Sequence, residues 1–248
     1  MDWRESDGVK WLEAELPGAR AAFTTRTGGS SEGAFASLNL GLLTDDGPAR
    51  VHANRNAMCR AVGVEPAGIV SGKQVHGSEV GRQEEPNERS AWLFGADGGL
   101  ALVDGWATSA EGLAPLVFVA DCLPVALAGD GGVAMIHCGW RGLAGGIAER
   151  GVREVSAEAA VIGPGIGPCC FEVGPEVTAE FSDLGEDIAD GRMLDLPEVC
   201  ERLLRRAGVE TIERSDLCTY CEADLFFSHR RDGGVTGRQA GLAWRCPS

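Results

Sequence analysis

The sequence predicts a mixture of α-helices and β-strands folded as one domain, and three observations support this class. Apolar runs of strand length recur along the 248 residues, most clearly at residues 116–125 and 133–138. Segments of helical character stand between them. No linker rich in proline and serine divides the chain, and we assign residues 1–248 to a single domain.

The N-terminal half is expected to alternate between short strands and one helix. A strand at residues 19–25 leads into a glycine-rich loop at residues 24–31. A helix is expected at residues 46–62, because Pro48 suits a first helical turn. A further strand is expected near residues 68–70. Residues 82–99 are polar and contain glycine, which is typical of a surface excursion.

The C-terminal half is expected to contain more strands and most of the helices. Asp121 and Cys122 interrupt the apolar run that spans residues 116–125. The last expected helix has Pro197 at its start and Val199, Leu203 and Leu204 on one face. After residue 125 the expected elements are a strand at 133–138, a helix at 142–157, a strand at 159–162, and helices near 175–182 and at 197–207.

The composition describes an acidic globular protein without a membrane span. The formal net charge of −15 argues against a general affinity for nucleic acid or for anionic membranes, although a local arginine cluster could still bind a small anion. No apolar stretch is long enough to cross a bilayer. The N-terminus lacks the pattern of a signal peptide, and we expect a cytoplasmic location.

Three metal-ligating side chains lie at or near the ends of expected strands. His76 and Cys122 are separated by 46 positions (122 − 76), and Cys122 and His137 by 15 (137 − 122), spacings that match no short metal motif. Two imidazoles and a thiolate nevertheless suit zinc and leave a fourth position open. The alternative is two hydrogen-bonded core histidines and an inert buried cysteine.

The remaining cysteines are interpreted as reduced thiols. The chain has nine, an odd number, with Cys169 and Cys170 adjacent. Cys218 and Cys221 form a CxxC pair, but no second CxxC or HxxxH completes a structural zinc site. We therefore expect Cys218 and Cys221 to be ordinary thiols.

Two glycine-rich loops carry an arginine each, Arg141 in residues 139–146 and Arg26 in residues 24–31. Such a loop at the start of a helix can bind an anion through backbone amides, but it can also serve only tight packing. Arg230, Arg231 and Arg238 form the densest basic cluster. We expect them to be partly salt-bridged to carboxylates, with phosphate contact as the alternative.

Eight blocks of the sequence, in this order, resemble the laccase-domain family, long labelled multicopper polyphenol oxidoreductases. The resemblance covers roughly residues 20–245. The blocks are residues 25–31 (TRTGGSS), 37–41 (SLNLG), 54–55 (NR), 73–77 (KQVHG), 120–124 (ADCLP), 137–142 (HCGWRG), 163–168 (GPGIGP), and 227–231 (FSHRR) with 236–238 (TGR).

The resemblance implies a fold, an activity and a metal site. The fold is α+β, a four-layer α/β/β/α sandwich with mixed sheets and the site at strand ends. The activity is that of a zinc-dependent purine nucleoside phosphorylase, which converts adenosine, inosine or methylthioadenosine and phosphate into free base and ribose 1-phosphate, with adenosine deaminase activity beside it. The implied metal ligands are His76, Cys122 and His137, which bind zinc, or copper as the alternative.

Further site residues follow from the matching blocks and from the chemistry of phosphorolysis. Asp104 and Asp121 are candidates for proton handling or for orienting a ligand histidine. The candidates for binding phosphate, ribose or base are Arg26, Asn39, Arg55, Gln74 and Arg141. Cys138 departs from the family pattern, which usually has serine there, and could offer the metal another ligand.

Three alternatives belong to other functional classes, and the oligomeric state stays open. Copper-dependent polyphenol oxidation needs a histidine-rich cluster, whereas the chain has only four histidines. A metal-independent hydrolase would use Cys122 as nucleophile with His76 or His137. A non-enzymatic binding module leaves the ligand residues and arginines without a chemical role.

Overall fold

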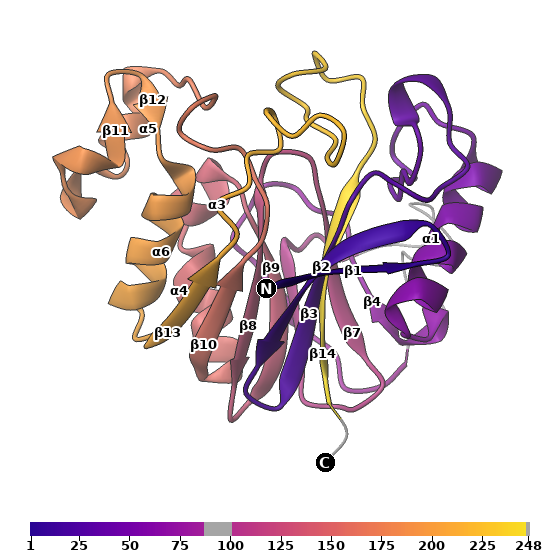
Figure 1. Cartoon of the computed structure of the whole chain (residues 1–248). Helices are drawn as coiled ribbons and strands as arrows, with labels where there is room; N and C mark the ends of the chain where they lie inside the picture. The colour runs from indigo at the N-terminus through magenta and orange to yellow at the C-terminus, as the bar shows by residue number, and fades with distance from the viewer. Residues whose placement is uncertain (87–100, 247–248) are drawn as a thin grey trace.

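The computed structural model describes residues 1–86 and 101–246, so most of the surface excursion expected at residues 82–99 lies outside the described residues. Two six-stranded sheets form the centre of the molecule (Figure 1). Helices cover the outer face of each sheet. The α-helices among the described residues are α1 (Pro48–Val62), α3 (Trp140–Ala144), α4 (Ile147–Val155), α5 (Pro175–Ala179) and α6 (Leu196–Arg206).

The first sheet combines the two ends of the chain with its middle. Its strands are antiparallel to their neighbours except for the last pair, β7 and β4, which run parallel. Their order across the sheet is β1 (Asp2–Ser6), β2 (Val9–Leu16), β3 (Ala19–Thr24), β14 (Gln239–Arg245), β7 (Ala114–Val119) and β4 (Ile69–Val70).

The second sheet is also mixed. The pair at each edge of the sheet is parallel, β10 with β13 at one edge and β5 with β6 at the other. The central strands are antiparallel. The order is β13 (Thr211–Arg214), β10 (Ala157–Ile162), β8 (Leu123–Gly129), β9 (Gly132–Cys138), β6 (Gly105–Thr108) and β5 (Val80–Arg82). A separate small hairpin pairs β11 (Ala189–Asp190) with β12 (Met193–Leu194).

Strand alternation sends successive side chains of each sheet into different layers. Val117 of β7 and Ala126 of β8 both belong to the apolar core between the sheets. Leu116 packs outward with Met58 of α1, and Leu127 packs outward into the core that contains α4 and α6. The four-layer α/β/β/α fold with mixed sheets is therefore confirmed.

The break at Asp121 and Cys122 separates two strands that belong to different sheets. The run at residues 116–125 becomes β7, which ends at Val119 in the first sheet, and β8, which begins at Leu123 in the second. The intervening residues carry the chain from one sheet to the other, and Asp121 has a φ of 91°. Cys122 consequently lies where the two sheets meet.

The expected helix at residues 142–157 is wrong as a single element. Helix α3 ends before Gly145, and α4 begins after Gly146, which has a φ of 85°. This left-handed conformation favours glycine and redirects the chain between the two helices. By contrast, the expected helix at residues 46–62 is confirmed as α1, with Pro48 in its first turn.

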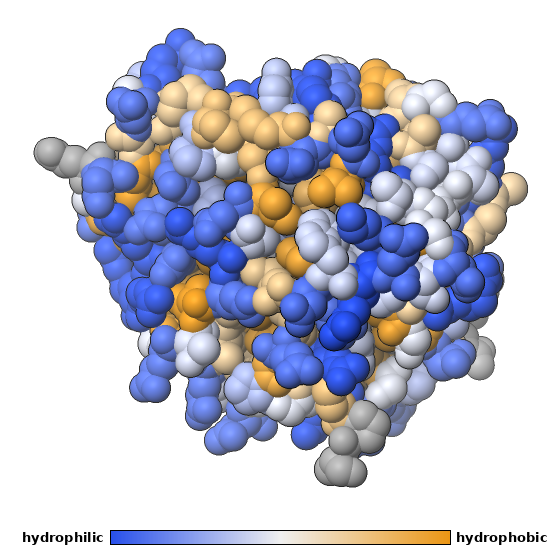
Figure 2. Space-filling model, in the orientation of Figure 1, coloured by the Kyte–Doolittle hydropathy of each residue, from blue (hydrophilic) through white to orange (hydrophobic). Residues whose placement is uncertain are grey.

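Polar side chains dominate much of the face of the molecule shown in Figure 2, with hydrophobic residues scattered among them. None of the helices in the described part of the chain is both long and apolar enough to cross a membrane.

Candidate metal centre and cavity

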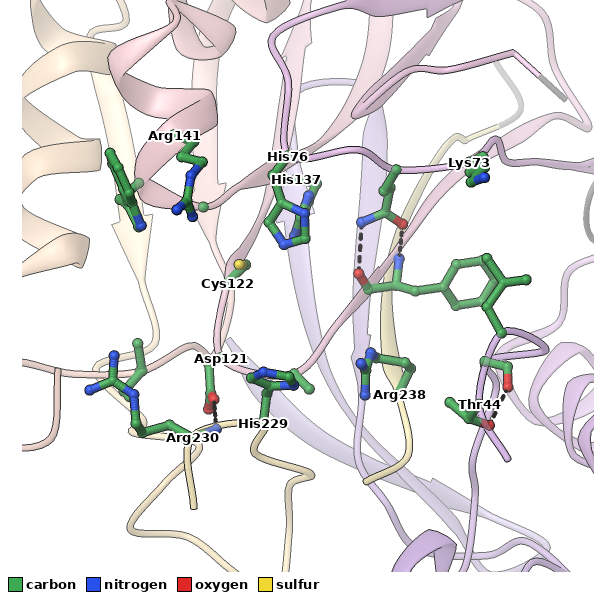
Figure 3. A pocket seen from close by; sticks show the side chains of 18 of the residues that line it. Thr44, Lys73, His76, Asp121, Cys122, His137, Arg141, His229, Arg230 and Arg238 are labelled. Carbon is green, nitrogen blue, oxygen red and sulfur yellow. Dashed lines mark hydrogen bonds between the residues drawn. The ribbon is translucent and has the colours of Figure 1, made fainter. Parts of the chain in front are cut away.

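Three separate segments bring His76, Cys122 and His137 together. His76 lies in the loop after β4, Cys122 lies in the link between β7 and β8, and His137 lies near the end of β9. One ligand atom from each side chain lies within 4.8 Å of the other two. The two imidazole rings are 4.9 Å apart between centroids, and both lie beside the Cys122 sulfur (Figure 3).

Asp104 contacts the ring of His137 and the backbone of His76, although it is not among the residues that line the cavity. Its buried carboxylate is 2.8 Å from the Nδ1 atom of His137. It also accepts hydrogen bonds from the backbone amides of Val75, His76 and Gly77, at 3.0, 2.9 and 2.7 Å. One carboxylate thus directs the other ring nitrogen of His137 away from Asp104 and holds the His76 loop in place.

The surroundings of the Cys122 thiol favour its ionised form near neutral pH. Burial raises the pKa of Cys122, but attraction and hydrogen bonding from His137 and His76 outweigh it and lower the pKa to about 6. Burial lowers the pKa of His137, yet the Cys122 sulfur and Asp104 raise it above its ordinary value. A thiolate beside an imidazole is both a metal ligand and the pair that a cysteine hydrolase would use.

Gly139 leaves room for the Cys122 sulfur. A Cβ atom at position 139 would lie 2.9 Å from Sγ of Cys122 and 3.5 Å from Cδ2 of His76. The φ of Gly139 is −83°, which any residue can adopt, so the requirement for glycine is steric.

The three candidate ligands line a cavity of about 470 Å³. Among the described residues, five basic side chains and one carboxylate, that of Asp121, line its wall. The residues that line it are Gly41, Leu42, Leu43, Thr44, Arg55, Gly72, Lys73, Gln74, His76, Phe118, Ala120, Asp121, Cys122, His137, Gly139, Trp140, Arg141, Ile166, Phe171, Leu196, His229, Arg230 and Arg238.

Hydrogen bonds already occupy both oxygens of Asp121. The Thr219 hydroxyl donates to one at 2.7 Å, and the backbone amide of Arg230 donates to the other at 2.7 Å. Asp121 therefore fixes two loops against the link that carries Cys122.

The basic residues of the wall are held by aromatic rings and carbonyl groups. The guanidinium of Arg141 lies 4.2 Å from the ring centroid of Trp140, and that of Arg230 lies 5.4 Å from that of Phe171. Arg238 donates to the carbonyls of Thr236 and Gly237. Within residues 1–86 and 101–246, no carboxylate forms an ion pair with Arg141, Arg230 or Arg238, so their charge is open to an anion.

Salt bridging in the basic cluster is therefore confined to one member. Arg231 pairs with Asp232 at 2.9 Å, as expected from the sequence. Arg230 and Arg238 instead face the cavity, which favours the alternative of anion contact for those two.

Three of the five predicted binding residues line the cavity: Arg55, Gln74 and Arg141. Arg55 is buried against Phe118, with its guanidinium 5.1 Å from the ring centroid, and burial lowers its pKa to about 9. The Gln74 amide exchanges two hydrogen bonds with the backbone of Phe118, at 2.8 and 2.7 Å. Gln74 therefore fixes the wall on which Arg55 rests.

The other two predicted binding residues, Arg26 and Asn39, are not among the residues that line the cavity. Arg26 donates to the carbonyls of Ala36 and Ala223 and holds two loops together. Asn39 is buried, and its side-chain oxygen accepts the backbone amide of Arg238 at 2.9 Å. Asn39 therefore positions an arginine of the wall.

Sequence reasoning gave no role to several residues of the wall, including Lys73, Phe118, Phe171 and His229. Lys73 and His229 belong to two of the blocks that resemble the laccase-domain family, residues 73–77 and 227–231. Their place in these blocks is the feature of the sequence that could have identified them as site residues. No local pattern indicates a functional role for Phe118, because it is one of several apolar residues in an expected strand.

Cys138 does not join the ligand group. His137 and Cys138 are successive residues of β9, so their side chains point to opposite faces of the sheet. The Cys138 thiol is packed in the apolar core with Ile147 and Cys200. Burial and the neighbouring Cys200 thiol raise its pKa well above the ordinary value, which disfavours a thiolate.

Comparisons with known proteins agree over nearly the whole chain. A family model described as multi-copper polyphenol oxidoreductase laccase matches residues 20–246. Purine nucleoside phosphorylase YlmD of Geobacillus stearothermophilus is 36% identical over 262 residues, covering 95% of this chain and 94% of that protein. Purine nucleoside phosphorylase YfiH of Escherichia coli is 35% identical over 240 residues, covering 92% and 94%.

Two crystal structures share the fold. That of YlmD from Geobacillus stearothermophilus has a TM-score of 0.85 at 34% identity and covers 98% of each chain. That of the Bacillus licheniformis hypothetical protein YfiH has a TM-score of 0.87 at 32% identity and covers 98% of this chain and 99% of that one.

Proposed function

Since the chain belongs to the multi-copper polyphenol oxidoreductase laccase family, whose relatives at about 35% identity are named purine nucleoside phosphorylases, we propose that it is a zinc-dependent purine nucleoside phosphorylase. Its substrates are a purine nucleoside (adenosine, inosine or methylthioadenosine) and phosphate, and its location is cytoplasmic. One observation carries the proposal: a single cavity joins the His76, Cys122 and His137 group to Arg141, Arg230 and Arg238, with which no described carboxylate forms an ion pair.

The donor set fits zinc. Two imidazole nitrogens and a thiolate are common zinc ligands, and a zinc ion held by these three side chains would keep a fourth position for water or substrate. When bound, zinc supplies Lewis acidity toward an oxygen or nitrogen of the substrate. A multicopper oxidase needs more histidine: of the two remaining, His229 lies elsewhere in the cavity wall and His52 lies in α1.

Arg141, Arg230 and Arg238 bind the phosphate. A dianion needs fixed positive partners in so acidic a protein, and aromatic rings or carbonyl groups already hold these guanidinium groups in place. A phosphate oxygen attacks C1′ of the ribose, the bond from C1′ to the purine nitrogen breaks, and its electron pair leaves with the base. The hydrogen phosphate loses its proton as it becomes the phosphate ester, and the departing purine nitrogen takes up one proton, so the step balances.

Asp104 and Asp121 act as positioning residues. The Asp104 carboxylate holds the His137 ring and the His76 loop, and hydrogen bonds occupy both oxygens of Asp121. Apolar surfaces of Phe118 and Phe171, on the wall of the cavity, provide contact area for a flat purine and its ribose.

Adenosine deamination is a second candidate activity, favoured by the position of the ligand group. All three donor side chains line the cavity, so a nucleoside can reach the open side of the group. Water adds to C6 of the adenine, and ammonia leaves. His76, Cys122 and His137 serve both reactions under this proposal.

Incubation of metal-quantified protein with adenosine, with and without phosphate, tests the proposal. We expect adenine and ribose 1-phosphate only when phosphate is present, and inosine in either case if deamination operates. The variant Cys122→Ala should lose both activities together with the metal of this site.

Two results would contradict this account. Full phosphorolysis by Cys122→Ala after loss of the metal at the His76, Cys122 and His137 site would remove that metal from the reaction. Hydrolytic activity that survives chelation but not alkylation of Cys122 would favour the cysteine hydrolase instead.

A further inference from the structure

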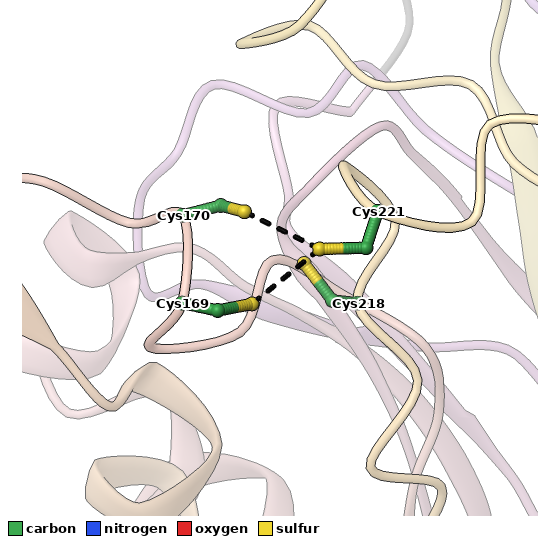
Figure 4. Close-up of side chains that lie close together, drawn as sticks. All are labelled: Cys169, Cys170, Cys218 and Cys221. Atoms are coloured by element: carbon green, nitrogen blue, oxygen red, sulfur yellow. Dashed lines mark hydrogen bonds between the residues drawn. The ribbon is translucent and has the colours of Figure 1, made fainter.

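Four cysteines from two distant loops converge at one place, away from the cavity. Cys169 and Cys170 lie in the loop between β10 and α5, and Cys218 and Cys221 lie in the loop between β13 and β14 (Figure 4). All four sulfur atoms lie within 4.8 Å of one another. The sulfur of Cys221 is 3.6 Å from that of Cys169 and 3.4 Å from that of Cys170.

These separations match the edges of a metal–thiolate tetrahedron. With a zinc–sulfur bond of about 2.3 Å, the sulfur atoms of a tetrahedral site lie about 3.8 Å apart. A disulfide would draw two sulfurs to about 2.05 Å and leave the others aside. All four thiols are free and point toward a common centre, which is the arrangement that a single ion requires.

The backbone around the cluster is tied together before any ion binds. The backbone amide of Gly167 donates to Sγ of Cys218 at 3.3 Å, a contact that stabilises a thiolate. The amide of Thr219 donates to the carbonyl of Gly165 at 2.9 Å, which joins the two loops. The amide of Cys170 donates to the carbonyl of Gly167 at 3.0 Å and closes the turn that presents the adjacent pair.

Arg231 holds the backbone between Cys218 and Cys221. The guanidinium of Arg231 donates to the carbonyls of Thr219 and Tyr220, at 2.8 and 3.2 Å, and these are the two residues between Cys218 and Cys221. Arg231 also pairs with Asp232. These contacts fix the backbone that carries two of the four cysteines.

We propose that Cys169, Cys170, Cys218 and Cys221 bind a structural zinc ion, separate from any metal at His76, Cys122 and His137. Each coordinated thiol releases its proton to solvent as it binds. Four thiolate ligands complete the coordination and leave no position for a substrate, so the site is structural. The expectation that Cys218 and Cys221 are ordinary thiols changes because their partners form an adjacent pair rather than a second CxxC.

The ion would fasten two loops that build the cavity. Phe171, next to Cys170, lies on the cavity wall. Thr219, next to Cys218, donates its hydroxyl to Asp121, the neighbour of Cys122. An ion at the four-cysteine cluster would therefore fix the position of the cavity wall relative to the link that carries Cys122.

Metal content of the full-length chain tests the proposal without reference to activity. We expect two zinc ions per wild-type chain, one in Cys122→Ala and one in the double variant Cys218→Ser with Cys221→Ser. The control Cys246→Ser, which changes a cysteine outside both groups, should keep two. Because Cys122→Ala leaves the four-cysteine cluster intact, the test does not depend on the double variant folding.

The spectrum of a substituted metal identifies the ligands. Cys122→Ala loaded with cobalt should show the thiolate-to-cobalt charge-transfer absorption of a tetrathiolate site, and the double variant should lack that of the cluster. Zinc-free Cys122→Ala purified with all its thiols reduced would overturn the proposal. A disulfide among the four cysteines, or iron in place of zinc, would overturn it too.

Discussion

At the scale of single residues, the carboxylate of Asp104 links the two histidines of the candidate metal centre. It contacts the His137 ring and the amide of His76 itself, while its own side chain is buried. Burial raises the pKa of Asp104, but hydrogen bonds from His137 and from the amides of Val75 and Gly77 outweigh it and lower the pKa. The residue stays ionised and acts through its two partners.

Asp104→Asn should weaken zinc binding at this centre by about 10–100-fold, because an amide holds the His137 tautomer less well than a carboxylate. Competition with a chromophoric chelator measures the affinity. Asp130→Asn, at an exposed turn, is the matched control and should leave it unchanged. Equal affinity in both variants would show that Asp104 does not support the ligand.

Gly139→Ala should lower activity by about 100-fold while the protein stays folded. The added Cβ, at 2.9 Å from the Cys122 sulfur, would have to displace it by roughly 0.5–1 Å. Gly47→Ala is the control, since Gly47 has a φ of −64° and open space at its Cβ position. Steady-state rates and the melting temperature of each variant distinguish a loss of activity from a loss of stability. Normal activity of Gly139→Ala would mean that the sulfur position is not critical.

Arg141→Ala should raise the KM for phosphate by roughly 10–100-fold, because it removes a charge-assisted contact of about 1.5–3 kcal/mol. Bound zinc should stay unchanged. Arg153→Ala removes an exposed arginine of α4 that does not line the cavity, and its kinetics should match the wild type. A raised KM for the nucleoside alone would place Arg141 at the base or ribose.

The sequence predicts single candidate ligands better than it predicts which distant residues the fold brings together. Polar residues at strand ends nominate His76, Cys122 and His137, although their spacing forms no local motif. The sequence does not predict that Cys169 and Cys170 lie beside the CxxC pair. About 50 residues separate the two pairs along the chain, and only the fold brings them together.

At the scale of secondary-structure elements, tertiary pairing decides what local patterns leave open. The apolar run at residues 116–125 reads as one strand, yet its halves pair in different sheets. Strand β14 was not predicted, since Ala240, Gly241 and Ala243 give little strand signal. It nevertheless lies in the middle of the first sheet, between β3 and β7.

Helix α6 offers a prediction about stability. Asp195 caps its N-terminus by accepting the amide of Glu198 at 2.9 Å, and the helix packs Val199, Leu203 and Leu204 into the core. Asp195→Ala should lower the free energy of unfolding by about 1 kcal/mol, measured by urea denaturation. Asp130→Ala, which removes an exposed turn carboxylate, should change it little. Equal stability of the two variants would show that the cap contributes nothing measurable.

At the scale of the whole molecule, the four layers bring one end of each sheet to a common cavity. The link from β7 to β8 and the end of β9 meet there, and loops from both halves of the chain complete the wall. In a chain of net charge −15, the described part of the cavity wall thus carries five basic side chains and one carboxylate. This local reversal of charge is what binding of phosphate requires.

The reaction of adenosine with phosphate in oxygen-18 water, followed by mass spectrometry of the products, tests the central proposal most directly. Phosphorolysis predicts adenine and ribose 1-phosphate without label, because phosphate supplies the new oxygen at C1′. Inosine labelled at C6 would report deamination beside it. Adenine and free ribose with no ribose 1-phosphate at any time in the reaction would show that water attacks C1′, and would contradict the assignment as a phosphorylase.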